Sequence, residues 1–156
     1  SGKLYERYEA CWGRHSCHLG VAKALKALAA IPDDRRSKSV REKIEQLVEY
    51  FLIHHIYKKS HDLEKVAKPG WLRFGFPLMY QTDLLELLEI FAELGIKDPR
   101  LEDAIRSVAN KRNNEGLWKM QNSFNDKILV AVEEKGKPSK WLTLSALKIL
   151  KFYDEL

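Results

Sequence analysis

Three clusters of aromatic and polar residues precede apolar stretches of helical periodicity in this 156-residue chain, at residues 11–18, 74–83 and 137–143. If the helices that follow run parallel around a cavity, the amides at their N-terminal ends favour an anion there. We therefore expect a site for a ligand with an anionic group and an apolar body. The expected ligand-binding residues are Trp12, Arg14, His15, His18, Phe76, Tyr80, Asp83, Lys140 and Trp141.

Within this expected site, Arg14 and Lys140 add positive charge, and Trp12, Tyr80 and Trp141 can form an apolar wall. The alternative is structural, with the aromatic residues filling one end of the core and the polar residues capping helices. The sequence assigns no catalytic residue and specifies no cofactor.

Soft metal ligands stand close together near the N-terminus, at Cys11, His15, Cys17 and His18. Thiolate and imidazole suit zinc, but the spacing matches no standard zinc module, and Gly13 interrupts a regular helix. A polar start of a helix is favoured, and we expect no metal. Cys17 beside His15 or His18 is also a conceivable nucleophile and base, but no orienting acid can be assigned.

A helical phrase returns about every sixty residues, at 20–31, 83–94 and 143–152, which predicts stacked helical hairpins. Periodicity and end signals predict five helices. They cover residues 16–30, a segment opening at Ser39, residues 82–94, a segment opening at Asp98-Pro99, and residues 140–153. The first, third and fifth are more apolar, so we expect them to form an inner layer wrapped by the other two.

The two longest connections, 60–81 and 113–139, are expected to carry function, because long ordered loops in compact folds often do. Residues 127–132 are the single β-like run and are assigned to a connection rather than to a strand. The sequence thus predicts an all-α fold and one helical repeat domain over residues 1–156.

Each long connection contains a glycine–tryptophan element, Pro69-Gly70-Trp71 in the first and Gly116-Leu117-Trp118 in the second. Together with the helical period, these elements resemble the prenyltransferase and squalene cyclase repeat superfamily, the α/α toroids. The resemblance implies a toroid-like stack of helical hairpins around a cavity for isoprenoid-like or peptide ligands. With about two and a half hairpins instead of five to seven, a partial toroid is expected, as part of a longer chain or completed by another one.

Two catalytic motifs of that superfamily have no counterpart here. The cyclases use an Asp-rich proton-donor motif, whereas Asp33-Asp34 lies in a charged turn between predicted helices. The protein prenyltransferases bind zinc through an Asp-x-Cys motif, which does not occur in this sequence.

The composition is that of a globular protein, with 45% hydrophobic and 31% charged residues and a net charge of +5. Basic clusters at residues 35–43 and 58–59 are diluted by acidic neighbours, so a nucleic-acid partner is not expected. No stretch reaches the ~18 apolar residues of a membrane span. Two cysteines are too few for a disulfide framework, which favours the cytoplasm.

Two functions are consistent with these features. The first is a prenyltransferase- or terpene-cyclase-like domain that binds, or binds and transforms, an apolar, isoprenoid-like ligand with an anionic head group. The second is a non-catalytic helical repeat module that binds a protein or peptide in its concave face.

Overall fold

The computed structural model describes residues 16–124 and 127–156. In these ranges the chain forms five α-helices, three short 3-10 helices and two β-strands. The α-helices are α2 (His18–Ala29), α3 (Lys38–Leu52), α4 (Leu84–Glu93), α5 (Glu102–Ala109) and α6 (Lys140–Phe152). The 3-10 helices are η1 (Asp33–Arg35), η2 (Pro69–Leu72) and η3 (Pro99–Leu101), and the strands are β1 (Lys58–Lys59) and β2 (Asp62–Val66).

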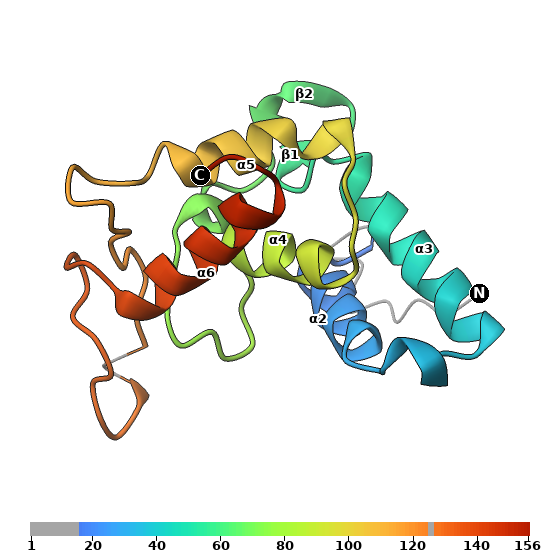
Figure 1. The fold of residues 1–156 in the computed structure, drawn as a ribbon, viewed down its shortest axis with the longest axis horizontal. Helices are drawn as coiled ribbons and strands as arrows, with labels where there is room; N and C mark the ends of the chain where they lie inside the picture. The colour runs from blue at the N-terminus through green and yellow to red at the C-terminus, as the bar shows by residue number, and fades with distance from the viewer. Residues whose placement is uncertain (1–15, 125–126) are drawn as a thin grey trace, which may run out of the picture.

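Helix α4 is the central element of the fold. It packs against α2, α5 and α6, and α3 packs on α2 (Figure 1). Seven of the ten residues of α4 are buried, including the acidic Glu86, because the helix is covered on several sides. The expected inner position therefore holds for α4. It does not hold for α2, which buries three of its 12 residues and is thus no more buried than α3, with four of 15.

The two strands form an antiparallel sheet directly after α3, with Lys58 opposite Val66 and Lys59 opposite Asp62. The chain turns out of α3 through His55 and Ile56, both at positive φ, and Ile56 is fully buried. The prediction of an all-α, toroid-like stack of hairpins is therefore wrong, and the described chain is a mixed α/β structure. The strands escaped prediction because lysine, glutamate and aspartate are depleted in strands, so the segment resembles a polar connection.

Trp118 anchors the second long connection in the core. Its side chain is fully buried, and its Nε1 donates a hydrogen bond to the Val108 carbonyl at 2.7 Å. Its backbone N–H donates to Thr143 Oγ1 on α6 at 3.1 Å. Two bonds to two different helices fix the connection that follows α5.

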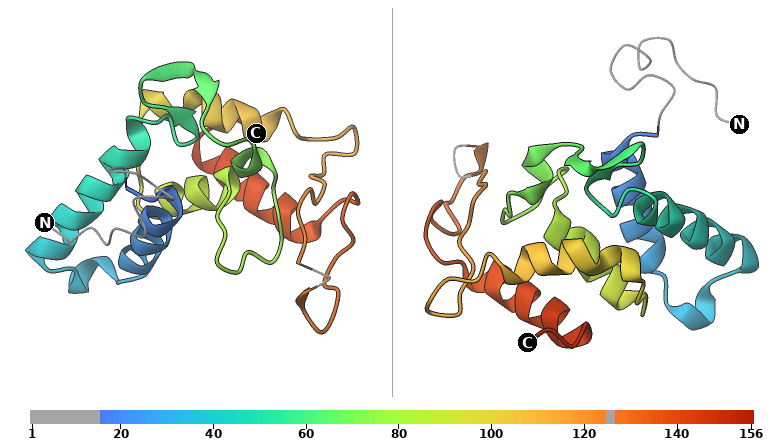
Figure 2. Two further views of the ribbon diagram at one scale, coloured as in Figure 1. Left: turned by 180° about the vertical axis from the view of Figure 1, so that it is seen from behind. Right: turned by 90° about the horizontal axis from the view of Figure 1, so that it is seen from above.

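The two long connections lie side by side. The backbone N–H groups of Gln121 and Asn122 both donate to the Phe74 carbonyl, at 2.8 and 3.0 Å. Gly75 and Asn122 form an isolated parallel bridge. Both connections reach the end of the molecule where α6 begins, drawn in green and orange in Figure 2. Among the described helices, none has the length and apolar character needed to cross a bilayer.

Candidate ligand-binding pocket

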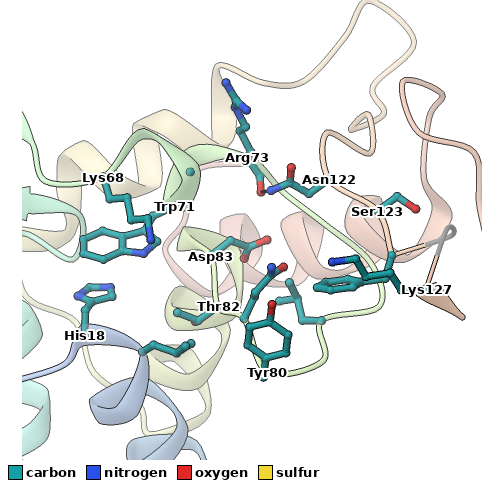
Figure 3. A pocket seen from close by; sticks show the side chains of 15 residues that line it. His18, Lys68, Trp71, Arg73, Tyr80, Thr82, Asp83, Asn122, Ser123 and Lys127 are labelled. Atoms are coloured by element: carbon teal, nitrogen blue, oxygen red, sulfur yellow. Dashed lines mark hydrogen bonds between the residues drawn. The ribbon is translucent and has the colours of Figure 1, made fainter. Parts of the chain in front are cut away.

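A cavity of about 450 Å³ lies between the start of α2 and the two long connections (Figure 3). Its apolar lining includes Leu19, Trp71, Leu78, Tyr80 and Phe124. Volumes of about 300–1,000 Å³ are typical of small-molecule sites. We call this cavity the main pocket.

Asp83 lies in the wall of the main pocket and caps α4. Its Oδ1 accepts a hydrogen bond from the Glu86 backbone N–H, and its Oδ2 accepts one from the Gly75 N–H, both at 3.0 Å. The side chain is buried. Burial raises the pKa of Asp83 to about 7, against the opposing effect of the backbone bonds from Glu86 and Gly75. Near neutral pH, Asp83 is thus a carboxyl group shared between its acid and carboxylate forms.

His18 lies at the opposite wall, at the start of α2. Its ring stacks on Trp71 with centroids 3.5 Å apart and meets Phe51 edge-on. Its Nε2 is buried and has no hydrogen-bond partner among the described residues. Burial, then the nearby charges of His54 and Lys68, lowers the pKa of His18 to about 3. The imidazole is therefore neutral at physiological pH, and its Nε2 is a buried polar atom without a partner among the described residues.

Three basic residues also line the main pocket: Lys68, Arg73 and Lys127. None forms an ion pair with another described residue. In Figure 3, Lys68 lies beside Trp71 at one end of the pocket and Lys127 lies at the other, with Asp83 between them. The Arg73 side chain extends away from Asp83 in the same view. Among the described lining residues, basic side chains outnumber the one carboxyl group, that of Asp83, which favours an anionic ligand.

A second, smaller cavity of about 230 Å³ adjoins the first, and Asp83 lines both. In its wall, Phe76 and Trp141 stack with ring centroids 5.2 Å apart. Glu86 also lines it and accepts hydrogen bonds from Lys23 Nζ at 2.8 Å and Lys26 Nζ at 2.7 Å. Although burial acts to raise the pKa of Glu86, these two lysines bring it below its usual value.

The structure distributes the predicted ligand-binding residues over both cavities. His18, Tyr80 and Asp83 line the main pocket. Phe76 and Trp141 line the smaller cavity, together with Asp83. Cys11, Trp12, Arg14 and His15 lie outside the described residues.

Lys140 lines neither cavity. Its Nζ lies 5.6 Å from the centre of the Trp141 ring, and its backbone N–H donates to Glu133 Oε1. As the first residue of α6, it serves the start of the helix. The positive charge expected from Lys140 is supplied in the main pocket by other residues.

The weak metal candidates that can be placed have structural contacts. Cys17 is a free thiol, and its Sγ accepts the Gly20 N–H at 3.5 Å as the N-cap of α2. His18 is packed between aromatic rings. Within residues 16–124 and 127–156, no three His, Cys, Asp or Glu side chains gather closely enough to hold a metal ion.

Sequence reasoning missed Lys68, Trp71, Arg73, Phe124 and Lys127 as pocket residues. A signal was present for the first three, because Trp71 belongs to the glycine–tryptophan element of a long connection and Lys68 and Arg73 flank that element. Phe124 and Lys127 come to the pocket through the pairing of the second connection with Phe74, which no local pattern reveals.

No protein-family model matches the chain, and neither a curated protein nor a solved structure is significantly similar to it.

Proposed function

We propose that this protein binds a small amphiphile, with an apolar tail and an anionic head group, in the main pocket. The observation that carries the proposal is that two lysines, Lys68 and Lys127, line one cavity without ion-pair partners among the described residues. Basic side chains donate charge-assisted hydrogen bonds to phosphate or carboxylate oxygens. A cavity lined by unpaired positive charge and one half-protonated acid is suited to such a head group.

The tail would lie along the aromatic lining. Trp71, Tyr80 and Phe124 provide ring surfaces, and Leu19 and Leu78 provide aliphatic ones. Such side chains bury apolar area at roughly 25 cal/mol per Å². The tail would supply most of the affinity, and the basic residues would fix its orientation.

An isoprenoid diphosphate is the ligand class we propose to test first. The glycine–tryptophan elements support this choice through their resemblance to prenyltransferases and squalene cyclases, and Trp71 of the first element lines the pocket. No catalytic residue is proposed. We also propose a cytoplasmic location, which the low cysteine count and the free thiol of Cys17 support.

Isothermal titration calorimetry with three probes tests the proposal. Farnesyl diphosphate carries head and tail, farnesol carries the tail alone, and inorganic diphosphate carries the head alone. We expect farnesyl diphosphate to bind more tightly than either part. The single head group occupies one end of the pocket, so either Lys68→Gln or Lys127→Gln should weaken farnesyl diphosphate binding about tenfold, as for one charge-assisted hydrogen bond. Lys151→Gln, an exposed lysine at the far end of α6, is the matched control and should bind as the wild type does.

Equal affinity of wild type and both pocket variants for farnesyl diphosphate would overturn the proposal.

The alternative function, a non-catalytic module that binds a protein or peptide, is favoured by Trp141. This residue stacks on Phe76 yet remains 42% exposed, and tryptophan is enriched at interface hot spots. This alternative function predicts that none of the three probes binds the protein. It also predicts that Trp141→Ala weakens binding of the protein or peptide partner.

A further inference from the structure

Large exposed hydrophobic side chains gather at one end of the molecule. They belong to the connection 76–82, to the connection 127–139 and to the first turns of α6, which lie at the lower left of Figure 1. Tyr80 and Phe124 pack edge to face across the two connections, and Phe76 stacks on Trp141 of α6. The members of this apolar end are Met79, Tyr80, Leu129, Val130, Val132, Trp141 and Leu144. The two other exposed large hydrophobics of the described chain are Ile53 and Leu156.

The connection 127–139 carries the most exposed part of the apolar end. Leu129 has a relative exposure of 105%, Val130 of 72% and Val132 of 48%. The segment projects away from the helices, as the orange loop of Figure 1 shows. None of these three side chains belongs to the hydrophobic core of the described residues, and exposed apolar groups of this kind mark an interaction surface.

Positive charge accompanies this apolar tip. Residues 127–140 contain the four lysines Lys127, Lys135, Lys137 and Lys140, against Glu133 and Glu134. Glu133 is engaged through the Lys140 backbone N–H. Lysine is depleted in the cores of protein–protein interfaces, whereas apolar side chains flanked by lysines suit an anionic lipid surface.

We propose that the connection 127–139 docks the protein on the surface of an anionic lipid bilayer. Leu129 and Val130 enter the boundary between head groups and acyl chains, and Lys135 and Lys137 contact lipid phosphates. The proposal stands on the exposure and charge of this segment and goes beyond ligand binding in the main pocket. It concerns a lipid surface contacted from one side, with no element crossing the bilayer.

Co-sedimentation with vesicles tests the docking surface. One set of vesicles contains phosphatidylcholine and phosphatidylserine in equal amounts, and the other contains phosphatidylcholine alone. We expect the protein to pellet with the anionic vesicles and much less with the neutral ones. The double variant Leu129→Asn/Val130→Asn should reduce partitioning at least about tenfold. The double variant Ile53→Asn/Leu156→Asn removes two exposed hydrophobic side chains elsewhere and should behave as the wild type does.

The lysines are tested separately. Lys135→Gln and Lys137→Gln should each reduce partitioning to anionic vesicles about fivefold and should flatten its dependence on salt. Leu129, Val130, Lys135 and Lys137 are all exposed, so the circular dichroism spectra and melting temperatures of these variants should match those of the wild type. Trp141 reports the geometry, because brominated lipids should quench the wild-type fluorescence more strongly than that of Trp141→Phe.

Three outcomes would overturn the proposal. The first is the absence of binding to anionic vesicles. The second is binding that Leu129→Asn/Val130→Asn and Ile53→Asn/Leu156→Asn reduce equally. The third is a concentration-dependent dimer in light scattering that Leu129→Asn/Val130→Asn abolishes, since this would assign the segment to a second copy of the chain.

Discussion

At the scale of single residues, the main pocket holds two ionisable groups whose pKa values are displaced in opposite directions. Burial favours the neutral form of each, so the acid Asp83 gains proton affinity and the base His18 loses it. Displaced pKa values of this kind gather at functional sites. They also make the free energy of unfolding depend on pH, and substituting each residue in turn measures its separate contribution.

Asp83→Asn should change the pH dependence of stability. The folded carboxyl holds its proton up to about pH 7, whereas the ordinary pKa of an aspartate is 3.8. Between these values the folded state binds more protons, so the free energy of unfolding of the wild type should fall as pH rises. The difference between wild type and Asp83→Asn, from urea unfolding at several pH values, should shrink or reverse from pH 4 to 7. If the two proteins showed parallel changes of the free energy of unfolding with pH, the pKa of Asp83 in the folded state would be its ordinary one.

The comparison of the wild type with His18→Phe should show the opposite change of the free energy of unfolding with pH. The unfolded imidazole takes up a proton below its ordinary pKa of 6.5, whereas the pKa of the folded imidazole is about 3. Acid therefore favours the unfolded state, and the stability contributed by neutral His18 is lost as pH falls between these values. Phenylalanine retains the stacking on Trp71 but does not titrate. The stability of the wild type relative to His18→Phe should thus rise from pH 3 to 6.5, and a constant difference would contradict the buried neutral state.

At the scale of elements, Glu86 joins α4 to α2. The carboxylate is 5% exposed, while Lys23 and Lys26, its partners on α2, remain 30% and 56% exposed. The pair is therefore asymmetric. The lysines can turn to water when Glu86 is lost, but Glu86 cannot do so when the lysines are lost.

This asymmetry predicts unequal costs at pH 7. The double variant Lys23→Met/Lys26→Met leaves a buried carboxylate without either cationic partner and should cost about 3 kcal/mol, the lower end of the range for a broken buried pair. Glu86→Met should cost about 1 kcal/mol or less, since it buries an apolar side chain of similar length and frees two solvated lysines. Chemical unfolding of both variants measures the difference. The reverse order would show that the lysines hold α2 by packing rather than by charge.

The helices were the part of the fold most accessible from sequence. All five predicted segments are helical, and their ends shift by a few residues. Helix α3, for example, begins after Ser37, whose side chain accepts the Val40 N–H, instead of opening at Ser39. The small sheet was missed because its residues favour solvent over strands. The main pocket was found in part, through His18, Tyr80 and Asp83, which cap or border predicted helices.

At the scale of the whole molecule, the hydrogen bonds that hold the connecting segments are unevenly distributed. The backbone N–H groups of residues 128–132 donate no backbone hydrogen bond to a described residue. The turn at η1 is fixed by backbone bonds and by the Arg36 side chain, which donates to the Ile31 and Ala29 carbonyls at 2.8 Å. Local opening should therefore be easiest in the connection before α6.

Limited proteolysis should show this difference. Trypsin should cleave first after Lys127 or Lys135, and only later after Arg35, because cleavage requires a segment that opens easily. The nicked protein should keep its helical circular dichroism and elute as one species. Mass spectrometry of the first fragments identifies the site, and first cleavage within α4 or α6 would contradict this distribution of local stability.

The paired bonds of Asp83 have a consequence for protein engineering. One carboxyl group holds both the residue that precedes the connection 76–82 and the helix that follows it, through Gly75 and Glu86. The connection is thus a cassette whose two ends are fixed by a single side chain. A library that varies its length and sequence, while retaining Gly75 and Asp83, could graft new recognition loops beside the pocket without redesigning the helical scaffold.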